Sequence, residues 1–183
     1  MKAFRLLETL LFGKKVTQKR GEFLASVALL RDAEFEKTGR EIKKIISELY
    51  GGRSLRIRAV DAGSTNAEEI ELTALTNAYY DIDRFGLSFV ASPRHADMLF
   101  VTGPVTRNLE RALRTTYESA PQPCIVVAIG NGAIDGGIWQ DSYAVVGGVD
   151  KVIPVHLRIP GDPPTPTAIL TGVLAALRNF KEQ

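Results

Sequence analysis

A group of carboxylates could do metal chemistry if the fold gathers them at one place. It comes with an amide and a hydroxyl, and it comprises Glu68, Glu69, Asp135 and Asp162 together with Asn131 and Thr65. Oxygen ligands in that number suit Mg²⁺ or Ca²⁺. The spacing does not demand a metal, however, because Glu68 and Glu69 would also stabilise the positive N-terminal turn of a helix. Asp162 would likewise accept backbone hydrogen bonds in a turn stiffened by prolines.

A glycine-rich run at residues 130–137, GNGAIDGG, could cradle a phosphate or a flavin at the edge of a sheet. It lacks the lysine of a P-loop and the glycine spacing of a dinucleotide-binding turn. The run therefore favours close approach of the backbone to its surroundings over nucleotide binding.

The two histidines, His95 and His156, are the natural candidates for acid–base chemistry near neutral pH. Neither lies in a motif with a serine, a cysteine or a second histidine as its catalytic partner. We therefore expect structural histidines and no catalytic residue. Arg94 and Asp97 flank His95, and we expect them to tie this loop to the chain itself or to a partner subunit. Trp139 is expected to serve packing or an interface.

The single cysteine, Cys124, limits the redox chemistry open to the chain. A disulfide, a Cys-x-x-Cys redox pair, a four-cysteine zinc site and an all-thiolate iron–sulfur cluster each need more thiolates than one. Cys124 also lies inside an apolar run, where a buried cysteine behaves as a small apolar residue. None of these centres is therefore expected.

Short apolar runs rich in Val, Ile and Phe alternate with helical stretches from about residue 53 onward. The predicted strands cover 55–60, 87–91, 98–102, 124–130 and 152–155. The predicted helices cover 66–76, 106–119 and 166–180, with Ser64, Thr106 and Thr165 as candidate N-caps. Such alternation is typical of parallel strands joined by right-handed crossovers. The sequence thus predicts an α/β fold with a small, doubly wound (flavodoxin-like) parallel sheet.

In such a sheet the functional loops leave the carboxyl ends of the strands. We expect those loops at 61–66, 92–97, 103–106, 130–138 and 160–165. They hold the carboxylates and the glycine-rich run, so the fold would bring these groups toward one edge.

An N-terminal helical extension over residues 1–52 is expected to precede the α/β domain of residues 53–183. Residues 1–12 have one apolar helical face. Residues 22–50 form a second helical stretch, with an interruption expected near Gly39.

Charge is unevenly divided along the chain. Residues 1–58 contain 14 Lys and Arg against 7 Asp and Glu, whereas the remainder contains 9 against 14. A basic amphipathic segment favours docking on the body or on a partner subunit, or else contact of residues 1–15 with lipid headgroups. No nucleic-acid-binding module accompanies the basic residues, so we expect no nucleic acid partner.

The chain of 183 residues is 45% apolar and 24% charged, which is the composition of a globular protein. No apolar run approaches the roughly 20 residues of a membrane-spanning helix. The N-terminus also lacks the order of a signal peptide. We therefore expect a cytoplasmic protein, with peripheral association to the membrane as part of a complex.

Seven motifs occur in a fixed order over about residues 55–177. They are DAGSTNAEEIE (61–71), YDIDRFG (80–86), SPRHAD (92–97), VTGPVT (101–106), GNGAIDGG (130–137), GVDKVIP (148–154) and IPGDPP (159–164). Together they resemble the 20-kDa cluster-bearing subunit shared by respiratory complex I and the membrane-bound energy-converting [NiFe] hydrogenases, including formate hydrogenlyase. The hydrogenase branch is nearer, because its first loop is of the Gly-Ser-Cys-Asn-x-Cys-Glu type.

The resemblance implies a site that this chain has changed. In that family four cysteines hold a [4Fe–4S] cluster beside a quinone pocket or a nickel–iron site, and the matching positions here are Thr65, Glu68, Gly132 and Asp162. Soft thiolates are the ligands that hold such clusters, and a hydroxyl, two carboxylates and a glycine do not replace them. We therefore expect the scaffold without the cofactor.

Two hypotheses of function follow from the resemblance. The first is a cluster-less, scaffolding subunit of a membrane-associated hydrogenase-like or NADH–quinone-oxidoreductase-like complex. Its partners would be a large [NiFe]-hydrogenase-like or quinone-site subunit and a ferredoxin-like subunit, contacted through residues such as Arg94, His95, Asp97 and Trp139. The alternative is a stand-alone, homo-oligomeric binding module that uses the vacated pocket for a small ligand or cation. An enzyme with a new activity ranks below both.

Overall fold

The computed structural model describes residues 32–181. Its helices are α3 (Ala33–Tyr50), α4 (Ala67–Ala74), α5 (Arg107–Ser119), α6 (Asn131–Asp135) and α7 (Pro166–Lys181). Its strands are β1 (Leu55–Asp61), β2 (Leu87–Phe89), β3 (Met98–Thr102), β4 (Val105–Thr106), β5 (Ile125–Ile129), β6 (Val145–Gly147) and β7 (Leu157–Ile159). The predicted helix at residues 1–12 lies outside the described residues, as does the start of the second helical stretch.

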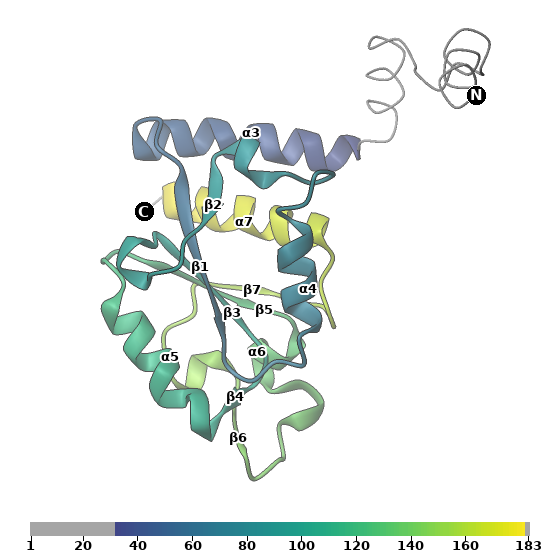
Figure 1. The fold of residues 1–183 in the computed structure, drawn as a ribbon, viewed down its shortest axis with the longest axis vertical. Helices are drawn as coiled ribbons and strands as arrows, with labels where there is room; N and C mark the ends of the chain where they lie inside the picture. Colours follow the sequence, from purple (N-terminus) through teal and green to yellow (C-terminus); the bar gives the residue numbers. More distant parts are fainter. Residues whose placement is uncertain (1–31, 182–183) are drawn as a thin grey trace, which may run out of the picture. The chain divides into compact units, whose positions relative to one another are not determined.

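The central sheet has the strand order β2-β1-β3-β5-β7, and every pair in it is parallel (Figure 1). Helices connect the strands and lie on both faces, so the predicted doubly wound α/β fold is confirmed. A short antiparallel ladder between β4 and β6 was not predicted. It joins the loop after β3 to the segment after α6. Val105 of β4 and Val145 of β6 are both buried there.

The two faces of the sheet carry two separate cores, which follow from the alternation of side chains along each strand. Met98 and Phe100 of β3 pack with α3, α4 and α7, whereas Leu99 and Val101 pack with α5 and α6. The neighbouring strands β3 and β5 are buried at every position because both faces of the sheet are covered there.

Helix α3 runs without a break through Gly39, so the interruption expected there is wrong. A Cβ at this position would lie 2.3 Å from the ring of Phe85. The glycine is therefore a contact point at which the aromatic ring packs directly on the helix, and the helix hydrogen bonds on either side continue across it.

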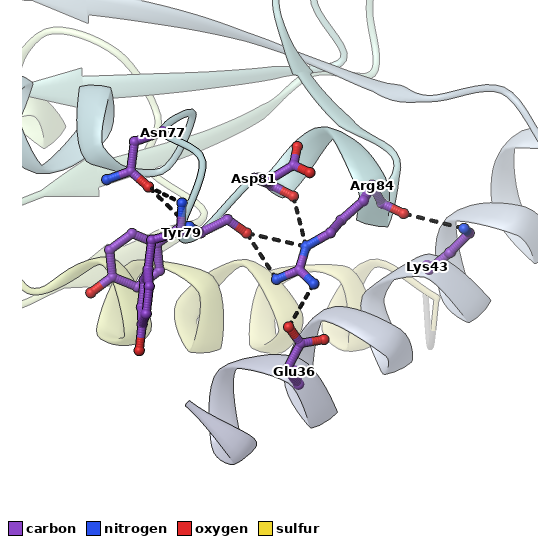
Figure 2. Close-up of polar contacts among 7 residues, drawn as sticks. Glu36, Lys43, Asn77, Tyr79, Asp81 and Arg84 are labelled. Atoms are coloured by element: carbon purple, nitrogen blue, oxygen red, sulfur yellow. Dashed lines mark hydrogen bonds and ion pairs between the residues drawn. The ribbon is translucent and has the colours of Figure 1, made fainter. Parts of the chain in front are cut away.

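Polar contacts fasten α3 to the segment between α4 and β2 (Figure 2). The guanidinium of Arg84 lies 2.5 Å from the carboxylate of Glu36 on α3 and also donates to the carbonyl of Tyr80. Lys43 on α3 donates in turn to the carbonyl of Arg84 at 3.2 Å. Residues 33–50 of the predicted extension thus pack on the α/β body, while the division of the chain at residue 52 stays a prediction.

The predicted strand at 152–155 is wrong. Val149–Lys151 form a 3-10 turn, after which Val152 and Ile153 are buried as core side chains. Pro154 has no N–H to donate, and pairing with β5 begins only where the N–H of His156 donates to the carbonyl of Val126. The strand β7 therefore lies a few residues further along.

Candidate functional site

The four positions predicted to match the family's cluster ligands line one pocket, together with residues from the neighbouring loops. We call it the cluster-position pocket; it has a volume of about 150 Å³, and its lining consists of Thr65, Glu68, Gly103, Pro104, Gly132, Gly137, Ile138, Trp139 and Asp162. These residues follow β1, β3, β5 and β7. The expected convergence at the carboxyl edge of the sheet is therefore present.

Glu68 is the buried carboxyl group of this pocket. It belongs to the first turn of α4, only 4% of its surface is exposed, and its Oε2 has no hydrogen-bond partner among the described residues. Burial raises the pKa of Glu68, and the nearby carboxylates of Glu69, Asp162 and Asp61 raise it further. The pocket thus holds an acid that resists ionisation.

Glu69, although adjacent in sequence, is bound elsewhere. Its Oε2 accepts a hydrogen bond from Ser64 Oγ at 2.5 Å, and its Oε1 accepts one from Thr102 Oγ1. The N-cap position of α4 is occupied by Asn66 with φ 72°, and no side chain caps it. The prediction of Ser64 as the N-cap is therefore wrong, because its hydroxyl joins the loop after β1 to Glu69.

Two further candidate ligands hold the loops in place. Asp135 Oδ1 accepts from the N–H of Gly137 at 2.7 Å. Asn131 Oδ1 accepts from the N–H of Gly161 at 3.1 Å, and its own N–H donates to the carbonyl of Gly161. Of the six residues in the predicted cation site, Thr65, Glu68 and Asp162 line the pocket and the other three do not.

No group of three or more His, Cys, Asp or Glu side chains within residues 32–181 is placed to hold a metal ion. The set that lines the pocket also does not fit an iron–sulfur cluster, since its donors are one hydroxyl and two carboxylates, with no side chain at Gly132. A Cβ at Gly132 would lie 2.9 Å from Cδ of Pro104, so the proline ring already occupies part of the space beside it.

Cys124 does not line the pocket. It lies just before β5 and is 3% exposed. Burial raises the pKa of its thiol to about 11, with a further contribution from the charge of Asp97. The thiol therefore stays protonated near neutral pH and packs as an apolar side chain, as expected.

The loop at 92–97 does not lie with the other loops. Arg53 donates two hydrogen bonds of 2.8 and 2.7 Å to Asp97, and the N–H of Arg56 donates a third at 2.9 Å. These partners precede β1 or lie at its start, so the loop returns to the amino edge of the sheet. Its grouping with the carboxyl-edge loops is wrong.

The predicted interface residues therefore fall into two places. Arg94 and His95 are exposed on the 3-10 turn near the amino edge, and Asp97 is held by the chain itself. Trp139 lines the cluster-position pocket at the opposite edge. Partial burial of Asp97 opposes its ionisation, but the hydrogen bonds from Arg53 and Arg56 outweigh it and hold its pKa below the ordinary value.

His156 has a structural role, as expected. Its Nδ1 accepts a hydrogen bond of 2.9 Å from the N–H of Val126, while its own N–H donates to the carbonyl of the same residue. The imidazole therefore extends the pairing between β5 and β7.

An apolar rim beside the pocket was not predicted as a unit. Ile138 is 83% exposed, Trp139 is 49% exposed, and Tyr143 follows shortly after in the chain and is also exposed. Three large exposed side chains within six residues are a signal that the sequence contains. Only the fold shows that none of these three side chains packs in the core, which is why the sequence alone does not identify them as an exposed apolar group.

Comparison with known proteins agrees with this geometry. Residues 66–176 match the family described as NADH ubiquinone oxidoreductase, 20 Kd subunit. That match covers more than half of the chain, which therefore belongs to this family of α/β subunits.

Two relatives are named as a subunit of a formate hydrogenlyase and as a probable subunit of a membrane-bound hydrogenase. Formate hydrogenlyase subunit 7 of Escherichia coli is 46% identical over 125 residues, which are 68% of this chain and 49% of that protein. A probable membrane-bound hydrogenase subunit of Pyrococcus furiosus is 42% identical over 143 residues, 77% of this chain and 86% of that one. The chain thus spans about half the length of the first relative and most of the second.

A solved structure extends the likeness to three dimensions. A chain of the membrane-bound sulfane sulfur reductase, an archaeal respiratory membrane complex, matches with a TM-score of 0.60 and 34% identity. The match covers 76% of this chain and 75% of that chain. Within residues 32–181, no helix combines the length and the apolar character needed to cross a membrane.

Proposed function

We propose that the chain is a cluster-less, structural subunit of a membrane-associated hydrogenase-like or NADH–quinone-oxidoreductase-like complex. Its relatives are named as subunits of a formate hydrogenlyase and of a membrane-bound hydrogenase. A subunit that has kept the loops of the family has kept the surface that those loops present, and such a surface serves to hold neighbouring subunits.

One observation carries the proposal. Thr65, Glu68, Gly132 and Asp162 line a single pocket at the carboxyl edge of the sheet, yet none of them offers a thiolate. The loops that form the site are present, whereas the thiolates expected in the family are replaced by two carboxyl groups, a hydroxyl and a glycine. Electron transfer through this position therefore has no carrier in the chain, and assembly is the role that remains.

The expected partners are a large [NiFe]-hydrogenase-like or quinone-site subunit and a ferredoxin-like subunit. Trp139 at the pocket and Arg94 with His95 at the amino edge are the two contact regions on the body. Residues 1–15 would add a peripheral contact with the membrane, because their basic and apolar residues suit a lipid surface.

Co-purification from the native host tests this function. A full-length chain tagged at its own locus is isolated from detergent-solubilised membranes, and its partners are identified by mass spectrometry. We expect a hydrogenase-like large subunit in about equal amount. Trp139→Ala and Arg94→Ala, each an exposed position, then tell which region makes the contact. A chain that elutes alone as a homo-oligomer would contradict the proposal and support a stand-alone binding module.

A further inference from the structure

The cluster-position pocket contains an unused polar group. Glu68 is 4% exposed, and its Oε2 contacts no hydrogen-bond donor among the described residues. A buried carboxyl oxygen without a hydrogen-bond donor is costly, because it has lost its hydration and gained no partner in exchange. Native structures therefore supply such a group with a partner, and a group that lacks one among residues 32–181 points to a partner from outside this part of the chain.

The charge of the lining indicates the chemistry of that partner. Glu68 and Asp162 are the ionisable residues among the lining residues, and the lining includes no Lys, Arg or His. Asp162 is exposed, so its carboxylate is open to a partner from outside. A cationic hydrogen-bond donor would satisfy both carboxylates at once, since charge-assisted hydrogen bonds are about twice as strong as neutral ones.

The rim and the size of the pocket indicate the shape of the donor. Ile138 and Trp139 line one side and are 83% and 49% exposed. An apolar stem would cover them, and a cation near the indole would gain a cation–π interaction. The volume of about 150 Å³ suits a head group of a few heavy atoms, because a water molecule occupies about 30 Å³.

We propose that the pocket receives a lysine or arginine side chain of the large partner subunit, with its head group bound to Glu68 and Asp162 and its stem against Ile138 and Trp139. This inference rests on the proposed function, because it names what the partner inserts at the position of the family's cluster. The cation would thus occupy the position at which the family is expected to hold its cluster.

Trp139 is the only tryptophan of the chain and reports on the pocket directly. The full-length protein is titrated with n-butylammonium and with n-propylguanidinium while the tryptophan emission is followed, and neutral n-propylurea serves as the matched probe. We expect saturable binding of at least one cation, at least tenfold tighter than that of the urea. Glu68→Gln should weaken it at least tenfold, and the exposed control Asp141→Asn should leave it unchanged. Equal responses to cation and urea would overturn the inference.

The complex from the native host gives the second test. Carbodiimide coupling, which joins carboxylates to amines, should link Glu68 or Asp162 to a lysine of the large subunit if the inserted residue is lysine. Whether the inserted residue is lysine or arginine, Asp162→Lys should reduce recovery of the large subunit at least tenfold. Because Asp162 is exposed, this variant is expected to fold, and Asp141→Lys is its matched control.

The outcomes separate the two proposals. If the wild-type chain recovers the large subunit and Asp162→Lys recovers it equally well, the proposal of an inserted cation is wrong, whereas the proposed role as a structural subunit is retained. If the wild-type chain recovers no such subunit, the proposed function itself fails.

Discussion

Gly130 lies directly against the side chain of Glu68, the buried carboxyl group of the cluster-position pocket. A Cβ on Gly130 would lie 2.5 Å from Glu68 Oε1. Gly130 has a φ of 87°, which glycine adopts without the steric cost that other residues meet. The turn that follows β5 is thus shaped around the buried carboxyl group.

Gly130→Ala should lower the free energy of unfolding by about 2–4 kcal/mol, since it combines a strained φ with a contact on a buried side chain. Urea denaturation measures the loss. Adding Glu68→Ala removes the atom that the new methyl group meets, so the double variant should recover at least about 1 kcal/mol relative to the sum of the single changes. Strictly additive losses would show that the two residues do not share this space.

Glu68→Gln should change how stability depends on pH. Burial raises the pKa of Glu68 above the ordinary 4.5, so the folded chain binds this proton more tightly than the unfolded chain. The wild-type protein therefore loses stability as pH rises from the ordinary pKa through the folded-state pKa. Glutamine does not titrate. The Tm of the variant should therefore rise relative to that of the wild-type protein by roughly 2–4 °C between about pH 4 and about pH 8.

Thermal denaturation across this pH range checks the shift. Glu118→Gln, an exposed change on α5, is the control and should keep a constant Tm difference. A constant difference for Glu68→Gln as well would mean that its carboxyl group ionises as freely in the folded chain as in the unfolded one.

Gly39→Ala should destabilise the protein although alanine favours helices. Its Cβ would lie 2.3 Å from the Phe85 ring, and overpacking of this kind costs about 1–3 kcal/mol. Ser47→Ala, an exposed gain of alanine on the same helix, should be neutral or slightly stabilising. Denaturant midpoints compare the two. A stabilised Gly39→Ala would show that Phe85 does not pack on the helix at this point.

Asp97→Asn should cost about 1–3 kcal/mol near neutral pH, because the carboxylate accepts two bonds from Arg53 and one from the N–H of Arg56. These bonds hold the pKa of Asp97 below the ordinary 3.8. The stabilisation is therefore complete above that value and is lost as pH falls through the folded-state pKa. Urea midpoints should show the variant's deficit shrinking in acid, whereas the exposed Asp83→Asn should show little deficit at any pH.

Much of the fold was predictable because the apolar pattern of the strands is strong. Met98 to Thr102 and Ile125 to Ile129 are buried at every position, and such short continuous runs between turns are typical of parallel strands. Thr165 precedes a proline and accepts from the N–H of Ala168 at 3.3 Å, as an N-cap does.

Other features depend on contacts between distant parts of the chain, and local patterns do not contain them. Val152 and Ile153 have the pattern of a strand but fill a core, since the paired segment begins beyond Pro154. Gly39 has the sequence character of a helix break, and only the structure shows that it lies against the ring of Phe85.

The candidate site divides in the same way. The motif order located Thr65, Glu68, Gly132 and Asp162, and the fold places them on one pocket. Glu68 and Glu69 are adjacent on α4, and the one that lines the pocket is Glu68. Glu69 instead accepts a hydrogen bond from Thr102 on strand β3. The sequence does not show that choice, because it is made by a tertiary hydrogen bond.

The absence of an iron–sulfur cluster is the central claim, and the metal content of the protein tests it most directly. The full-length chain is expressed together with an iron–sulfur assembly system, purified without oxygen, and assayed for iron and acid-labile sulfide. We predict less than about 0.1 of each per chain, because carboxylates and a hydroxyl do not hold the cluster. About four irons and about four sulfides per chain, with the visible absorption of a cluster, would contradict the account.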